Sequence, residues 1–389
     1  MTHSIVWHRG HDACLFSDSI ITGGSPPRRQ WSSFGEPLSN ARGQPVNDNG
    51  LKLVRTGNAV LTFAGVVDTW HDFLNVYKRC IRFGDNPRET FGQAARSLSP
   101  LGNPRQLAVA AAWHEDGCVS AVAFNADGAG NVCDIAPSST VQLGSFSDDD
   151  RDNAEQFTQA LESTFKLEAK EKWVLGLATL QLRAMTDALT LNGIGGALGS
   201  CRVLSDAIEW QPDIMYVMVQ PAPAKPVFLG SVIARHDGLL VETTVGGGLP
   251  QAVMTTYSDG TKQLLSEWKK DGLRRIVEEL GVPKRDYLVL LNSPPTSIVV
   301  VDMRKQSMTK NVELHGVRWK NGDTGFNISF SDKVYQALFA RPPMDSPPGH
   351  RPIILEYVPF EPLTPEEVDA LIRKRGWKLS ADPPESGRT

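Results

Sequence analysis

The stretch LKLVRTGNAVLTFAG, residues 51–65, constrains the fold more than any other part of the sequence. It places two β-prone runs on either side of Gly57 and Asn58, and a two-residue loop of this composition is typical of a tight β-hairpin. The second run ends on Phe-Ala-Gly, just before apolar residues at helical spacing in VDTWHDFLNVYKRCIRF. The sequence therefore predicts an antiparallel hairpin that leads into a helix with one apolar face.

Hairpins and helices recur through the first half of the chain. SIVWH and ACLFSDSIITGG form one candidate hairpin, and RQLAVAAAWHEDGCVSAVAFNADG forms another, with Asp116 and Gly117 at its turn. STVQLGSFSDDD adds a short strand, helices are expected over about 151–165 and 171–190, and NGIGGALGSCRVL returns the chain to a strand. Strands in hairpins with helices packed outside them are typical of an α+β layered domain.

A change in composition near residue 220 predicts a second domain. The segment QPAPAKP, residues 220–226, is rich in proline and is expected to be a stiff connector. A chain of 389 residues also exceeds what one hydrophobic core usually serves. We expect a first domain over 1–220, a mixed α+β domain over 221–380 and a disordered tail over 381–389. The later part should hold several strands, a helix over about 260–280, and a last helix that begins with Thr364 as N-cap and Pro365.

Composition excludes some classes of function. The formal net charge is −4 and the basic residues are scattered, which disfavours nucleic-acid binding. No run approaches the roughly 18 apolar residues of a membrane helix, and no signal-peptide pattern opens the sequence, so we expect a cytoplasmic protein with no membrane contact. The five cysteines lack zinc-ligand spacing and are expected to be buried thiols.

Several of these sequence segments, taken in order, resemble segments of the proteasome β-type subunits and of their simpler bacterial two-ring relative. Those proteins have the N-terminal-nucleophile (Ntn) hydrolase fold. The similar segments are SIVWHRGHDACLFSDS, LKLVRTGNAVLTFAG, LAVAAAWHEDGCVSAVAFNADG, QLGSFSDD and GIGGALGSCRVL. The resemblance covers about residues 1–220 and implies a four-layer αββα sandwich there. Residues from 221 onward resemble no family that we can name.

The resemblance implies a catalytic mechanism and its residues. An Ntn hydrolase uses the side chain of the first residue of the mature chain as nucleophile and its own α-amine as base. Thr2 would take this role after removal of Met1, and Asp18 follows it at the family's interval of sixteen residues. Lys52 would lower the pKa of the threonine hydroxyl, and Asp18 would keep this lysine oriented and charged.

Three further residues complete the implied site. Ser145 would hydrogen-bond the terminal amine, and the backbone N–H groups of the turn with Ala64 and Gly65 would form the oxyanion hole. The implied function is a threonine-type peptidase or amidase that needs no cofactor and no metal. Its partners would be a peptide or protein substrate, further copies of the chain in a ring, and an unfoldase or another protein.

The sequence departs from the family at several positions. The family's Gly-Ser-Gly turn has Phe146 as its third residue here, and the family's Asp-x-x-Ser is replaced by Leu191 and Ile194. Aligning the first strand on Ile-Val instead puts His3, not Thr2, at the nucleophile position. The alternative hypothesis is therefore a catalytically inactive proteasome-like scaffold or sensor, whose C-terminal domain binds a partner.

Each candidate residue also has a purely structural interpretation. Thr2 can be a permissive second residue, Asp18 can cap a strand end, and Lys52 can be a solvated charge. Ser145 and residues 63–65 can serve only the turns in which they lie.

Two other motifs carry weaker hypotheses. His8, His11 and Asp12 cluster in the loop of the first hairpin, and an exposed polar loop is favoured there over a metal site because no further ligand has suitable spacing. VGGGLP, residues 245–250, lacks the lysine and Ser/Thr of a phosphate loop and is expected to be a flexible turn.

Overall fold

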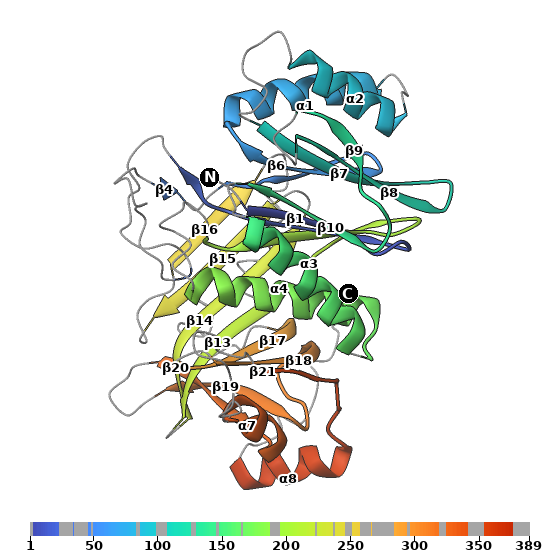
Figure 1. Cartoon of the computed structure of the whole chain (residues 1–389). Helices are drawn as coiled ribbons and strands as arrows, with labels where there is room; N and C mark the ends of the chain where they lie inside the picture. The colour runs from blue at the N-terminus through green and yellow to red at the C-terminus, as the bar shows by residue number, and fades with distance from the viewer. Residues whose placement is uncertain are drawn as a thin grey trace, which may run out of the picture.

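A computed structural model of the chain describes most of the elements expected from the sequence (Figure 1). The described residues are 3–22, 34, 46–47, 50–82, 86–98, 107–125, 130–144, 148–164, 166–186, 195–221, 224–235, 238–245, 251–256, 266, 284–293, 296–318, 324–340 and 354–375. Thr2, Ser145, Phe146, Leu191 and Ile194 lie outside them, as do 246–250, the tail over 381–389 and nearly all of the helix expected over 260–280.

Two five-stranded sheets lie face to face in the first half of the chain. The first sheet has the order β10-β1-β2-β11-β12, and the second has the order β5-β6-β7-β8-β9. The first sheet consists of β1 (His3–His8), β2 (Ala13–Asp18), β10 (Ser139–Gly144), β11 (Leu198–Val203) and β12 (Ile208–Trp210). The second consists of β5 (Leu53–Thr56), β6 (Ala59–Gly65), β7 (Leu107–Glu115), β8 (Cys118–Phe124) and β9 (Val132–Asp134). All pairings in both sheets are antiparallel.

Helices α1 (Val67–Arg82) and α2 (Pro87–Ser97) cover the outer face of the second sheet (Figure 1). Alternate side chains of β6 explain why nearly the whole strand is buried: Leu61 and Phe63 pack toward these helices, whereas Val60 and Ala64 belong to the core between the sheets. The ring of Phe63 stacks on Trp70 of α1 with centroids 4.5 Å apart. The end of the hairpin is therefore fixed against the helix that follows it.

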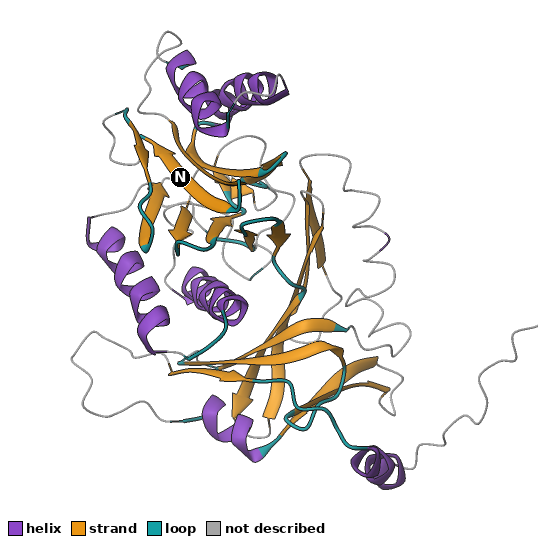
Figure 2. Cartoon of the chain, turned by 90° about the vertical axis from the view of Figure 1, so that its right-hand side faces the viewer, coloured by secondary structure: helices purple, strands orange, loops and turns teal. Residues whose placement is uncertain are grey.

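Helices α3 (Asp148–Thr164) and α4 (Ala169–Thr186) lie beyond the first sheet (Figure 1). Residues 173–182 of α4 are buried without interruption, and a helix that is buried all round must have packing partners on opposite sides. In α4 these partners are the first sheet and a third sheet, between which the helix lies (Figure 2). Gly176 permits close packing, because a Cβ there would lie 3.3 Å from Leu161 Cδ1 of α3.

The third sheet is mixed and has the order β16-β15-β14-β13-β17-β18-β21. Its strands pair antiparallel, except that β13 is parallel to β17 and β18 is parallel to β21. Its strands are β13 (Ile214–Pro221), β14 (Ala224–Arg235), β15 (Gly238–Val245), β16 (Gln251–Thr256), β17 (Arg285–Asn292), β18 (Ser297–Gln306) and β21 (Ile354–Val358).

The two faces of the third sheet bury different cores. Alternate residues such as Tyr216, Val289 and Val300 join the core that contains α4, whereas Val217 and Leu290 face a separate core. This separate core includes residues of the ribbon β19 (Val312–Arg318) and β20 (Thr324–Phe330) and of helix α7 (Asp332–Leu338). The other elements in the described part of the chain are the short pair β3 (Ile21–Thr22) and β4 (Val46–Asn47) and the helix α8 (Pro365–Arg375).

The local predictions from turns and caps are confirmed. Gly57 and Asn58 form the turn between β5 and β6, and both Asp116 and Gly117 have positive φ at the turn between β7 and β8. Helix α8 begins at Pro365, and the Thr364 hydroxyl accepts a hydrogen bond from the N–H of Glu367. Helix α2, which the sequence analysis missed, begins at an equally clear signal, an Asn86 side chain that accepts from the N–H of Arg88.

The segment expected as an interdomain connector takes part in the third sheet. Gln220 pairs with Lys225 and Pro221 pairs with Ala224, so these residues form the ends of β13 and β14. A division at 220/221 falls inside this hairpin, because β13 shares its sheet only with later strands. The division into domains remains a proposal, and a division by sheets would place the boundary before Ile214.

Two expectations from composition concern membrane helices and the burial of the cysteines. None of the helices in the described part of the chain is long and apolar enough to cross a membrane. The five cysteines form no disulfide, but only Cys14 and Cys201 are buried, so the expectation of buried thiols is wrong for Cys118 and Cys133, which are exposed.

Candidate functional site

An acid and an ammonium group meet at one end of the first sheet. Asp18 is the last residue of β2, and Lys52 directly precedes β5 of the second sheet. Lys52 Nζ lies 2.6 Å from Asp18 Oδ1, and the side chains are 1% and 0% exposed respectively. The structure thus brings together two of the residues proposed from the sequence, and neither is a solvated charge.

Three backbone N–H groups also bond to the Asp18 carboxylate. Oδ1 accepts from the N–H of His3 at 2.9 Å, and Oδ2 accepts from Ile20 at 3.3 Å and from Gly195 at 3.2 Å. The His3 bond fixes the beginning of β1 beside the Asp18–Lys52 pair.

Burial lowers the pKa of Lys52, and the neighbouring Asp18 carboxylate opposes this shift. The cause is that an ammonium group loses its hydration inside the protein, which disfavours its charged form. A lysine held in this way can hold or give up a proton closer to neutral pH than an exposed lysine can.

The Gly195 N–H is held in place by helix α4. The Gln181 side chain is fully buried, donates to the carbonyl of Gly196 at 2.9 Å and accepts from the N–H of Leu198 at 2.9 Å. Gly195 has φ +142°, a conformation that L side chains rarely adopt, so glycine is required where the segment turns toward Asp18. Sequence reasoning missed Gln181, because a polar residue in an apolar helix shows no partner until the fold is known.

A group of buried hydroxyls joins the two sheets next to this site. Thr62 of β6 donates to Ser4 of β1 at 2.9 Å, and the Ser4 and Ser17 hydroxyls lie 2.8 Å apart. Ser4 also donates to the carbonyl of Phe63 at 3.2 Å. These residues were not predicted; the available signal was a hydroxyl residue inside each of three mostly apolar strands.

The predicted oxyanion residues lie at the end of β6. Ala64 is 5% exposed, and Gly65 is exposed with φ +129°. The preceding Phe63 carbonyl contacts Ser4, so this end of β6 lies beside the beginning of β1. On the other side of β1, His3 pairs with Gly144, the residue before Ser145.

The loop of the first hairpin contains a buried ion pair, so the expectation of an exposed loop is wrong for Asp12 and holds for His11. Asp12 is fully buried and lies 2.6 Å from Arg202 Nε of β11 and 3.6 Å from Arg9 Nε. His8 is also buried, with Nδ1 2.8 Å from the carbonyl of Ile135, whereas His11 is exposed. Among the described residues, no group of His, Cys, Asp or Glu is arranged to hold a metal ion.

Comparisons with known proteins leave the family open. No protein-family model and no curated protein match the chain. It is similar to a Gly-1 mutant of Anbu from Hyphomicrobium sp. strain MC1, with 10% identity and a TM-score of 0.37 over 54% of this chain and 87% of that chain. It is also similar to eukaryotic HslV from Trypanosoma brucei, with 17% identity and a TM-score of 0.35 over 52% of this chain and 99% of that chain. At TM-scores this low the two similarities assign no activity to the chain.

Proposed function

We propose that the chain is an N-terminal-nucleophile hydrolase, a peptidase or amidase that acts through Thr2 after removal of Met1. One observation carries the proposal: the His3 N–H lies 2.9 Å from an Asp18 carboxylate that is itself 2.6 Å from the Lys52 ammonium. A peptide bond joins Thr2 to His3, so an amine and a hydroxyl on residue 2 would adjoin this buried pair.

The reaction follows from these groups. The Thr2 hydroxyl attacks the substrate carbonyl and passes its proton to the α-amine, while Lys52 favours the developing alkoxide. The oxyanion of the tetrahedral intermediate accepts hydrogen bonds from N–H groups at Ala64 and Gly65. Collapse expels the leaving amine, which takes the proton from the α-ammonium group, and water then hydrolyses the ester on Thr2. Ser145 would hold the α-amine during both steps.

The proposal extends to architecture and assembly. We assign the residues before Ile214 to a four-layer αββα sandwich, supported by the order of α1 and α2, the two facing sheets, and α3 and α4 (Figure 1). The later residues would form a second, mixed domain. We further propose a cytoplasmic protein that acts on peptides or proteins as a ring of identical copies, with an unfoldase or other protein partner. Native mass spectrometry tests the assembly, and a strict monomer would contradict it.

Intact mass and peptide cleavage test the activity together. The purified chain should lack Met1 and should cleave members of a fluorogenic peptide panel, whereas Thr2→Ala should fold normally and lose cleavage. A chain that keeps Met1 has no free threonine amine and cannot perform this chemistry. A trimmed wild-type chain without cleavage would instead support the inactive scaffold or sensor.

A further inference from the structure

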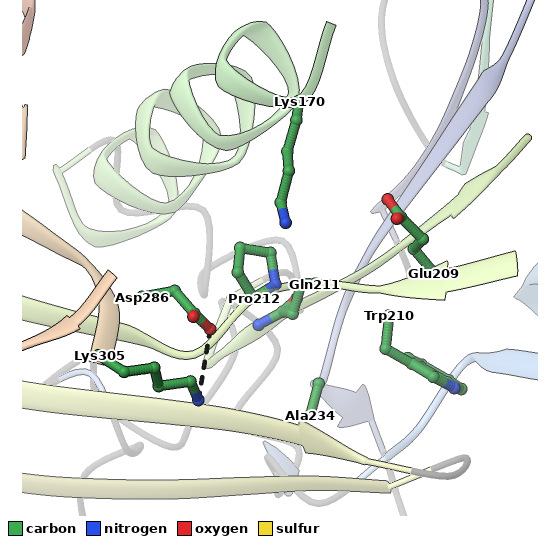
Figure 3. A pocket seen from close by; sticks show the side chains of 8 residues that line it. All are labelled: Lys170, Glu209, Trp210, Gln211, Pro212, Ala234, Asp286 and Lys305. Atoms are coloured by element: carbon green, nitrogen blue, oxygen red, sulfur yellow. Dashed lines mark ion pairs between the residues drawn. The ribbon is translucent and has the colours of Figure 1, made fainter. Parts of the chain in front are cut away.

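A hollow of about 380 Å³ lies where the start of α4 and strand β12 meet the third sheet (Figure 3). Its volume is within the range of about 300–1,000 Å³ found for small-molecule sites. None of its lining residues belongs to the Asp18–Lys52 site. The lining residues are Lys170, Glu209, Trp210, Gln211, Pro212, Ala234, Asp286 and Lys305.

Hydrogen bonds fix the wall of the hollow on the side of the third sheet. The N–H of Asp213 donates to Asp286 Oδ2 at 2.9 Å, and the N–H of Asp286 donates to the Asp213 carbonyl at 2.9 Å. Lys305 pairs with the Asp213 carboxylate and lies 3.4 Å from Asp286 Oδ2. The N–H of Gln211 donates to the Ser200 carbonyl at 2.9 Å, which ties the same segment to β11. Asp286, Lys305 and the backbone at Gln211 are therefore held in place before any ligand arrives.

Two side chains in the hollow, Gln211 and Lys170, lack partners among the described residues, and a third, Asp286, uses only one of its carboxylate oxygens. Gln211 is 2% exposed, yet neither its amide nitrogen nor its amide oxygen has a hydrogen-bond partner there. Lys170 is exposed and has no acidic partner in the same set, and Asp286, whose side chain is 30% exposed, engages only its Oδ2. Figure 3 shows Lys170 and Lys305 reaching the hollow from different sides, with Gln211 between them. A buried amide without partners is costly unless a ligand supplies them.

We propose that this hollow binds a small zwitterion, a free amino acid or a dipeptide. The ligand carboxylate would bind Lys170 and the Gln211 amide N–H, which are both donors. The ligand ammonium would bind the Asp286 carboxylate and the Gln211 amide oxygen, which are both acceptors. Trp210, Pro212 and Ala234 supply apolar surface for the ligand side chain.

The acidic residues argue against an inorganic anion in this place. Glu209 and Asp286 line the hollow together with the two lysines, so a phosphate that approached Lys170 would also face two carboxylates. A molecule with charges of both signs satisfies all the unpartnered groups at once, whereas a simple anion satisfies only the donors. The inference does not depend on the hydrolase proposal, because it concerns binding at a different place.

Calorimetric titration of the full-length chain tests the inference. The probes are L-leucine and glycyl-leucine, N-acetyl-leucine without the amine charge, leucinamide without the carboxylate, and inorganic phosphate. We expect one of the two zwitterions, L-leucine or glycyl-leucine, to bind. N-acetyl-leucine and leucinamide should bind at least about tenfold more weakly than that zwitterion. Phosphate should not compete with it.

Variants locate the site. Lys170→Met should weaken zwitterion binding about tenfold and should change leucinamide binding little, because leucinamide lacks the group that Lys170 contacts. Lys166→Met is the matched control, an exposed lysine outside the hollow, and should bind as wild type does. Gln211→Met removes both amide partners at similar volume and should also weaken binding. Absence of binding by either zwitterion up to about 10 mM, or equal affinity in wild type and Lys170→Met, would overturn the proposal.

Discussion

Lys52 and Asp18 form an ion pair, with Nζ and Oδ1 2.6 Å apart, that is almost completely enclosed by the protein. Removing one partner of such a pair leaves an uncompensated charge in a place that water does not reach. The pair also joins the two sheets, since Asp18 ends β2 and Lys52 precedes β5. The contribution of this pair to the free energy of unfolding can be tested separately from its proposed role in catalysis.

Single and double replacements should show strong coupling between the two residues. We expect Asp18→Asn and Lys52→Met each to lower the free energy of unfolding by about 3–5 kcal/mol, and the double variant to lose less than the sum. Urea unfolding of the four proteins measures this cycle. The exposed pair Arg88–Asp134, at 2.7 Å, is the control, and its loss should cost less than about 1 kcal/mol. Additive losses at Asp18 and Lys52 would contradict the account.

The stability that depends on this pair should rise with pH in the alkaline range. Burial lowers the pKa of Lys52 in the folded chain, from 10.5 in the unfolded reference. Between the lowered value and 10.5 the unfolded chain binds more protons at this residue, so its contribution to the free energy of unfolding increases with pH. The difference in free energy of unfolding between wild type and the double variant should therefore increase with pH. Urea unfolding from about pH 7 to about pH 10 measures this difference. A difference that falls over this range would mean that the pKa of Lys52 is raised instead.

The buried pair at the first hairpin should also matter for stability. Arg202 Nε lies 2.6 Å from Asp12 Oδ2, and Asp12 is fully buried. Arg202→Met should lower the free energy of unfolding by about 3 kcal/mol, and Arg202→Lys should restore part of the loss because it keeps the charge. Thermal or urea unfolding measures both variants. A loss no larger than that of Arg88→Met, which breaks an exposed pair, would show that the Asp12 site is open to water in solution.

Four of the five cysteines should divide into two classes in the native protein, and Cys80 is intermediate in exposure. Cys118 and Cys133 are exposed, whereas burial raises the pKa of the Cys14 thiol and shields Cys201. With a maleimide at neutral pH, Cys118 and Cys133 should be modified first, and Cys14 and Cys201 only after unfolding, because the thiolate is the reactive form. Peptide mass mapping of a time course gives the order. Early modification of Cys14 would show that the first sheet opens or that its packing differs.

The parts of the fold that could be predicted are those set by local chemistry. The turns at 57–58 and 116–117 and the start of α8 at Pro365 depend on residues adjacent in sequence. Strand β13 was missed because it ends in a proline-rich segment, and its parallel partner β17 is far along the chain. Pairings of this kind depend on the packing of the whole sheet, which no local pattern reveals.

The candidate site also combines residues that could be predicted from the sequence with residues that could not. Asp18 and Lys52 were proposed because the sequence around them resembles a known family, and the structure places them in contact. Gln181 and the Ser4, Ser17 and Thr62 hydroxyls were not proposed, because each acts through a contact between distant elements. Asp12 was misjudged for the same reason: its partner Arg202 lies on β11, far from it in sequence.

The most direct test of the central claim is to locate the acyl group during turnover. The chain should be incubated with an activated ester and quenched, and the acylated residue identified by peptide mass mapping, in wild type and in Thr2→Ala. The account predicts an acyl group on Thr2 of the chain that begins with this residue, and none at that position in Thr2→Ala. Acylation of another residue, or equal acylation of residue 2 in both proteins, would contradict it.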